Sequence, residues 1–126
     1  MKAPENYLYS AEHMWVKHVE DGTWLAGITD YAQDLLGDVV FIEPPLVGSH
    51  LVAGVSCGIV ESVKTGADLF APLNGEVIAI NTDVINTPES IQDAPYDAWI
   101  FKIKTTENTE QKHLLSAADY KALLKV

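Results

Sequence analysis

The residues of this sequence that are best placed to do chemistry surround one lysine, in the run Val60-Glu61-Ser62-Val63-Lys64-Thr65-Gly66-Ala67-Asp68. Apolar runs that predict strands flank it, Val55 to Val60 before it and Leu69 to Phe70 after it. Two strands joined by a short polar segment that contains Gly predict a β-hairpin, with Lys64 near its tip. An exposed lysine is a poor general base, because burial is what tunes a lysine for that role. The same amine is a good attachment point for a group carried on a long arm, and this is the chemistry we expect of Lys64.

The other reactive side chains form no catalytic or metal-binding pattern. Histidines stand at four positions with neither HxxxH nor Cys-His spacing, so no metal site is predicted: His13, His18, His50 and His113. Cys57 lies in an apolar strand pattern and is expected to act as a small buried hydrophobe. The acidic pair Asp34 and Asp38, and Glu12 beside His13, are better explained as a solvated acidic face. With no phosphate-binding or nucleophile motif present, we expect a protein that is not an enzyme.

Composition narrows the class of protein further. The chain has 126 residues, 48% of them hydrophobic, which is enough for the core of a single domain. Its formal net charge of −10 disfavours nucleic acid and anionic lipid and favours basic protein partners. No apolar window is long enough for a membrane span, and the N-terminus does not resemble a signal peptide. A single cysteine fits a reducing compartment, so we expect a cytoplasmic protein; a mitochondrial matrix protein whose transit peptide has been removed would look the same.

Short strands with frequent turns dominate the predicted secondary structure. After an aromatic opening at 7–10, the pattern predicts strands at 13–19, 24–28, 38–42, 51–52, 55–60, 69–70, 76–80 and 96–103. We expect Trp99 to be the heaviest apolar anchor of the last of these strands. The stretch 81–95 is rich in Asn, Asp, Thr and Pro and is predicted to wrap the surface with at most one helical turn. This pattern is typical of a mainly β small barrel or sandwich, organised as one domain over 1–126.

Two helices carry clear start and stop signals. The first begins at Thr29 or Asp30 and ends at Gly37, with apolar residues on one face: Ala32, Leu35 and Leu36. The second is predicted at about 116–125, after a capping pattern that starts at Ser116. Its apolar face carries Tyr120, Leu123 and Leu124.

Two motifs, in register with each other, resemble a known family. They are Glu61-Ser62-Val63-Lys64 and Gly27-Ile28-Thr29-Asp30-Tyr31-Ala32-Gln33, accompanied by His13, Trp15, Pro72-Leu73-Asn74-Gly75-Glu76-Val77, Pro95-Tyr96 and Trp99. On these residues the sequence resembles, over nearly its whole length, the H-proteins of the glycine cleavage system. These are lipoyl carrier proteins.

The resemblance implies a fold, a cofactor and partners. The fold is a barrel-sandwich hybrid with flanking helices. Lys64 is then the site of amide-linked lipoate, attached by a lipoate ligase or octanoyl transferase that recognises the hairpin residues Glu61, Ser62 and Val63. The arm would carry an aminomethyl group between glycine decarboxylase and aminomethyltransferase, after which dihydrolipoamide dehydrogenase would reoxidise the dithiol.

One departure from the family opens a second interpretation. The family usually has Glu where this chain has Met14, and a thioether cannot pair with an aminomethyl cation as a carboxylate can. Asp68 and Glu12 are the candidates to contact the arm instead. The alternative is an H-protein-like lipoate-binding protein that carries sulfur for a heterodisulfide-reductase-like system. A third interpretation is an unmodified acidic β domain used for docking.

Overall fold

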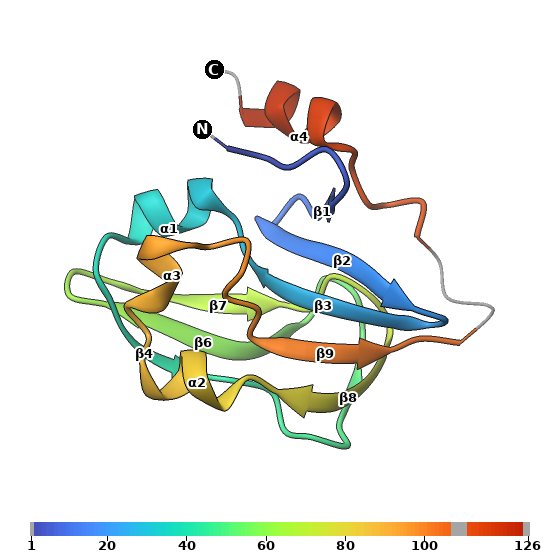
Figure 1. Cartoon of the computed structure of the whole chain (residues 1–126), viewed down its shortest axis with the longest axis horizontal. Coiled ribbons are helices and arrows are strands. Elements are labelled where there is room, and N and C mark those ends of the chain that lie inside the picture. The colour runs from blue at the N-terminus through green and yellow to red at the C-terminus, as the bar shows by residue number, and fades with distance from the viewer. Residues whose placement is uncertain (1, 107–110, 125–126) are drawn as a thin grey trace.

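The computed structural model describes residues 2–106 and 111–124. The strands are β1 Leu8–Tyr9, β2 Met14–Glu20, β3 Thr23–Ile28, β4 Val39–Glu43, β5 His50–Leu51, β6 Ser56–Ser62, β7 Gly66–Phe70, β8 Gly75–Ile80 and β9 Phe101–Lys104. The helices are α1 Asp30–Leu36, α2 Thr82–Asn86, α3 Ser90–Asp93 and α4 Ala117–Leu124 (Figure 1). None of the helices in these two ranges is long and apolar enough to span a bilayer.

The strands form two antiparallel sheets with the main core between them. One sheet has six strands in the order β1-β2-β3-β9-β8-β5, and the other has three in the order β4-β6-β7. The core draws Val16 and Ile103 from the larger sheet and Val60 and Leu69 from the smaller one. Strand β8 begins with buried and exposed residues in alternation, as the period of a β-strand requires. The expected mainly β, barrel-sandwich arrangement with flanking helices is therefore confirmed.

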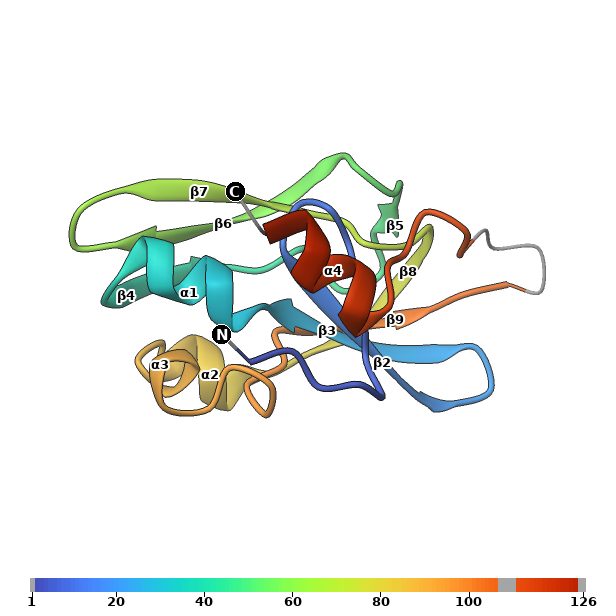
Figure 2. The same cartoon turned by 90° about the horizontal axis from the view of Figure 1, so that it is seen from above.

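Strand β2 is buried on both of its faces. Met14 and Val16 point into the main core, whereas Trp15 points the other way into a second apolar cluster with Tyr9 and Tyr120. Helix α4 packs over β1 and contributes Tyr120 to this second cluster, which closes the outer face of the sheet (Figure 2). The C-terminal helix is thus part of the folded body.

Helix α1 begins and ends where the sequence signals predict. Thr29 is its N-cap, and the Thr29 hydroxyl accepts a hydrogen bond from the Ala32 N–H. The chain leaves the helix at Gly37, whose φ of 80° is strained for other residues. Because α1 lies between β3 and β4, it connects the larger sheet to the smaller one beside the β6–β7 hairpin.

Three local predictions were wrong. The stretch 81–95 contains two short helices, α2 and α3, because Val84 and Ile91 provide buried apolar anchors. The last strand starts only at Phe101; the preceding residues form a turn in which the Ala98 N–H donates to the Ala94 carbonyl. Trp99 is only half-buried, and the fully buried tryptophan is Trp15.

The C-terminal helix agrees with its prediction at the start. The Ser116 hydroxyl accepts a hydrogen bond from the Asp119 N–H, as expected of a cap. Residue 125, where the prediction ended, lies outside the described residues.

Candidate functional site

Lys64 lies at the tip of the β6–β7 hairpin, which extends away from the rest of the smaller sheet (Figure 2). The two strands pair up to Glu61 and Gly66, so the connection is only 63–65, shorter than the sequence indicated. Polar residues continue the strands here because the outer face of this sheet is exposed. The Lys64 side chain is exposed, as a modification site requires.

Hydrogen bonds hold the turn in one conformation. The Ser62 N–H donates to the Thr65 carbonyl at 2.7 Å, and the Ser62 hydroxyl accepts from the Thr65 N–H at 3.1 Å. The Val63 N–H donates to the Asp38 carbonyl at 3.0 Å, which ties the turn to the segment after α1. A Lys64 side chain on such a turn is presented in a defined direction.

The other predicted hairpin residues differ in their roles. Ser62 is buried and stabilises the turn, whereas Val63 is 74% exposed and Glu61 is exposed on the outer face opposite Phe41. Val63 and Glu61 are therefore accessible to another protein together with Lys64.

A cleft of about 330 Å³ lies beside β7. Its lining comes from three separate stretches of the chain: Ala11, Glu12, His13 and Met14; Ile28, Ala32, Leu35 and Leu36; and Val60, Ala67, Asp68, Leu69 and Phe70. Most of the lining is apolar. Ala67 is three residues beyond Lys64 along the chain, so the hairpin that carries the lysine also forms one side of the cleft.

The structure brings the two candidate arm contacts together. Glu12 and Asp68, which are far apart in sequence, both line this cleft and are both exposed. Met14 also lines it, but only 1% of its surface is accessible. The cleft thus combines a buried thioether and aliphatic walls with two carboxylates at its exposed parts, an arrangement suited to a ligand with an apolar chain and a cationic end.

The sequence did not reveal how the cleft is assembled. The shared face of Ala32, Leu35 and Leu36 was predicted, but nothing in the sequence pairs it with β7. His13 also lines the cleft, and burial lowers the pKa of its imidazole. The only feature of the sequence that pointed to the cleft was the pair of motifs around Thr29 and Lys64 that carry the family resemblance.

The remaining reactive groups are placed elsewhere. Cys57 lines a different hollow, and burial raises the pKa of its thiol to about 11, so it stays protonated and unreactive at neutral pH. Within residues 2–106 and 111–124, no three His, Cys, Asp or Glu side chains are grouped so that they could hold a metal ion.

A small β domain that presents one exposed lysine beside a half-open apolar cleft has the architecture of a cofactor carrier. Residues 7–126 match the family model described as "Glycine cleavage H-protein". The glycine cleavage system H protein of Methylobacillus flagellatus is 59% identical over 98% of this chain and 99% of its own length. The one from Klebsiella pneumoniae is 45% identical over 97% and 95%.

A solved structure agrees with these sequence relatives. The crystal structure of a glycine cleavage system H protein from Mycobacterium marinum superposes with a TM-score of 0.87 at 38% identity, covering 95% of this chain and 97% of the other. The chain belongs to the glycine cleavage H-protein family, and its role is that of a lipoyl carrier in glycine cleavage. Nothing in these comparisons favours the sulfur-carrying alternative.

Proposed function

We propose that the chain is a single carrier domain in which the Lys64 amine is joined through an amide bond to lipoate. The observation that carries the proposal is the exposed Lys64 on a fixed turn, a few residues from an apolar cleft. The residues present fit this group, because aliphatic walls accommodate its hydrocarbon chain while the hairpin leaves the amine open to an acylating enzyme.

The cleft residues have distinct tasks in this proposal. When bound, the lipoyl group supplies a dithiol and its disulfide, which accept and release an aminomethyl group. Leu36, Val60 and Leu69 exclude water from the apolar part of the arm. Glu12 and Asp68 attract the cationic end, taking the place of a carboxylate at Met14. The protein contributes by raising the effective concentration of the arm at successive active sites.

The proposed partners follow from the family. Lipoate ligase or octanoyl transferase would contact Glu61, Ser62 and Val63 when it modifies Lys64. Glycine decarboxylase, aminomethyltransferase and dihydrolipoamide dehydrogenase would then use the arm in turn, in the cytoplasm. The carboxylates around the hairpin favour partners with basic surfaces.

The direct test is the intact mass of the purified protein after incubation with lipoate ligase, lipoate and ATP. We expect one lipoyl group per chain on the wild type and none on Lys64→Arg, because Arg keeps the charge but offers no acylatable amine. The melting temperatures should agree, since the Lys64 side chain is exposed. Lys121→Arg, an exposed lysine on α4, is the matched control and should be modified like the wild type. Modification of Lys64→Arg at another lysine would refute the assignment.

A further inference from the structure

Two of the three stretches that line the cleft, here called its walls, lie within hydrogen-bond distance of one buried hydroxyl group that does not itself line the cleft. One wall is the turn that contains His13, between β1 and β2; the other is α1, whose N-cap is Thr29. The phenol oxygen of Tyr120 lies 2.8 Å from His13 Nδ1 and 2.8 Å from Thr29 Oγ1. Tyr120 belongs to α4, is fully buried, and does not line the cleft. The phenol oxygen of Tyr120 therefore connects the C-terminal helix to both walls by hydrogen bonds.

The hydrogen bonds continue from this atom into each wall. Thr29 Oγ1 also accepts the Ala32 N–H, and Ala32 lines the cleft. The Thr29 N–H donates to the His13 carbonyl at 3.0 Å, which links the walls a second time. Loss of the Tyr120 hydroxyl would remove a partner from both His13 and Thr29 at once.

The backbone of His13 shows that its position is constrained. It has a φ of 70° and is the one non-Gly residue of the described chain in the left-handed region. Left-handed positions in tight turns are usually occupied by Gly, because a side chain at that φ costs free energy. The His13 ring contacts the rings of both Tyr120 and Tyr31, at centroid distances of 5.8 and 4.8 Å. These contacts fix the ring at the edge of the cleft.

We propose that Tyr120 is a positioning residue that holds the His13 turn and the start of α1 at a fixed separation, so that the C-terminal helix determines how firmly the cleft retains what Lys64 carries. The consequence for retention rests on the function proposed above; the coupling between the walls does not.

The protonation states of Tyr120 and His13 allow the hydrogen bond between them at neutral pH. Burial raises the pKa of Tyr120 to about 12, so the phenol keeps its proton at neutral pH. Burial also keeps the His13 imidazole neutral, since its pKa is lowered. Because Thr29 Oγ1 already accepts the Ala32 N–H, the buried Thr29 hydroxyl is satisfied by donating to the Tyr120 oxygen, and the Tyr120 O–H then donates to the neutral His13 Nδ1.

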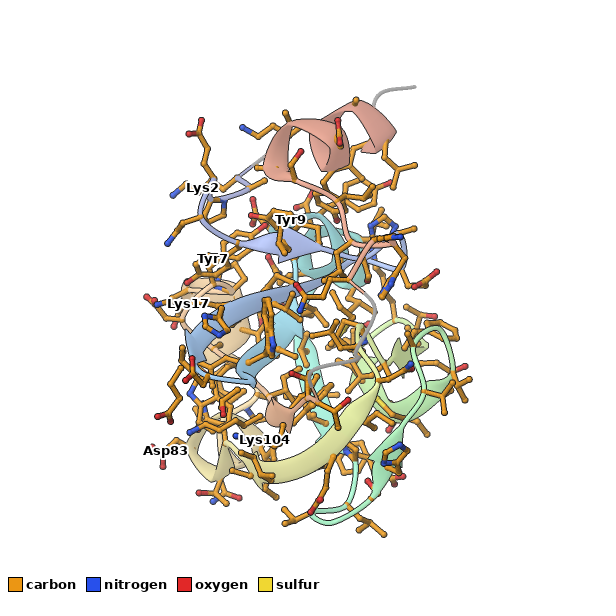
Figure 3. All side chains as sticks on the ribbon, turned by 90° about the vertical axis from the view of Figure 1, so that its right-hand side faces the viewer. Lys2, Tyr7, Tyr9, Lys17, Asp83 and Lys104 are labelled. Atoms are coloured by element: carbon orange, nitrogen blue, oxygen red, sulfur yellow. The ribbon has the colours of Figure 1, made fainter. Side chains whose placement is uncertain are left out.

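The test compares Tyr120→Phe with Tyr9→Phe. Tyr9, which lies on β1 beneath α4 (Figure 3), is the matched control because it is as fully buried as Tyr120 and its ring stacks on the Tyr120 ring at a centroid distance of 4.8 Å. The Tyr9 hydroxyl donates to the Pro4 carbonyl, and neither residue lines the cleft. Each variant removes one buried hydroxyl from the same aromatic cluster. The first measurement is amide hydrogen exchange of the unlipoylated protein at Thr29, relative to Val16 in the main core. The second is the rate at which fully lipoylated, aminomethyl-loaded protein loses the group by hydrolysis to formaldehyde, ammonium and free thiol.

We expect Tyr120→Phe to exchange the Thr29 N–H, and to lose the carried group, about fivefold faster than the wild type, the factor that corresponds to one typical hydrogen bond. Tyr9→Phe should match the wild type in both measurements. Unchanged Thr29 exchange in Tyr120→Phe, or an equal change in Tyr9→Phe, would overturn the positioning role. If the wild type retains the group no longer than a lipoylated peptide does, the cleft function proposed above fails, while the exchange measurement still decides whether Tyr120 couples the walls.

Discussion

At the scale of single residues, Lys64 is unusual because no other basic residue stands near it in the sequence. Between Lys17 and Lys102, Lys64 is the only Lys or Arg, and every other formally charged residue of that stretch is Asp or Glu. Acylation replaces this ammonium by a neutral amide, so the sequence between Lys17 and Lys102 then carries no Lys or Arg charge. A cationic group on the arm would then be attracted to the nearest cleft carboxylates, Glu12 and Asp68.

The first residue-scale prediction concerns this attraction. Asp68→Asn should shorten the retention of an aminomethyl-loaded arm about twofold to fivefold, the range for an exposed ion pair. Met14→Glu should lengthen it, because a third carboxylate would line the same cleft. The half-life of the loaded protein, followed by mass spectrometry without partner enzymes, measures both effects. Glu76→Gln, on β8 outside the cleft, is the control, and equal half-lives for all four proteins would show that no carboxylate holds the arm.

The second residue-scale prediction concerns pH. Burial lowers the pKa of His13 in the folded protein. Between the folded and the unfolded pKa, the unfolded chain therefore binds more protons at His13 than the folded chain does. The contribution of His13 to stability is complete above the ordinary histidine pKa of about 6.5 and is lost as the pH falls toward the lowered folded value. Urea unfolding at several pH values between about 5 and 7.5 gives the free energy of unfolding at each pH. The slope of this free energy against pH should be smaller in His13→Gln than in the wild type. Identical slopes in the two proteins would contradict the assignment.

At the scale of elements, the β2–β3 pair is a close fit that depends on one missing side chain. Trp15 lies opposite Gly27, and a Cβ at Gly27 would approach the indole ring to 2.7 Å. The indole N–H also donates to the Pro95 carbonyl at 3.0 Å, so the ring cannot move without breaking that bond. Gly27 therefore leaves room for Trp15 in the second apolar cluster. Trp15 lies on β2 beside Met14, which lines the cleft.

This fit predicts that Gly27→Ala destabilises the protein by about 1–3 kcal/mol, the usual cost of overpacking. Gly66→Ala is the control, because a Cβ there would meet its nearest neighbour, Glu61 Cγ, at an ordinary 3.6 Å. Its free energy of unfolding should change by no more than about 0.5 kcal/mol. Denaturant titration measures both; a Gly27→Ala protein as stable as Gly66→Ala would mean that Trp15 repacks freely.

At the scale of the whole molecule, charge is unevenly distributed over the fold. The strand lysines outside the hairpin lie on the larger sheet: Lys17 on β2, and Lys102 and Lys104 on β9. The smaller sheet exposes Glu61 and Asp68 on the two hairpin strands and Glu43 at the end of β4, opposite Ile59. A protein with a basic surface around its active site would therefore be steered to the hairpin end.

We predict that kcat/KM for lipoylation by a lipoate ligase falls at least about tenfold between roughly 0.01 and 0.15 M salt, as the Debye length shrinks from about 30 to about 8 Å. Glu43→Gln should show a shallower salt dependence of kcat/KM than the wild type, because it removes one of the three exposed carboxylates named above on the smaller sheet. A rate that does not depend on salt would show that electrostatic steering plays no part in this encounter.

The elements near the site were predictable to different degrees. The hairpin, α1 with its Thr29 cap, and the start of α4 follow from signals within a few neighbouring residues, and the structure contains them. The strand expected over 96–103 starts only at Phe101, because the residues before it form a turn. In that turn the Tyr96 hydroxyl donates to the Lys2 carbonyl at 2.6 Å and accepts the Asp30 N–H at 3.2 Å. Such long-range contacts override local strand propensity.

The sequence by itself determined that one lysine stands exposed on a short hairpin, because a hairpin is specified by its own turn and its flanking strands. Only the tertiary structure decided what lies beside that lysine. Glu12, Leu36 and Asp68 line one cleft because the β1–β2 turn, α1 and β7 pack together, and Tyr120 reaches its walls because α4 folds back over β1. No local pattern encodes these distances, since they arise from burying apolar surface shared by segments far apart in the chain.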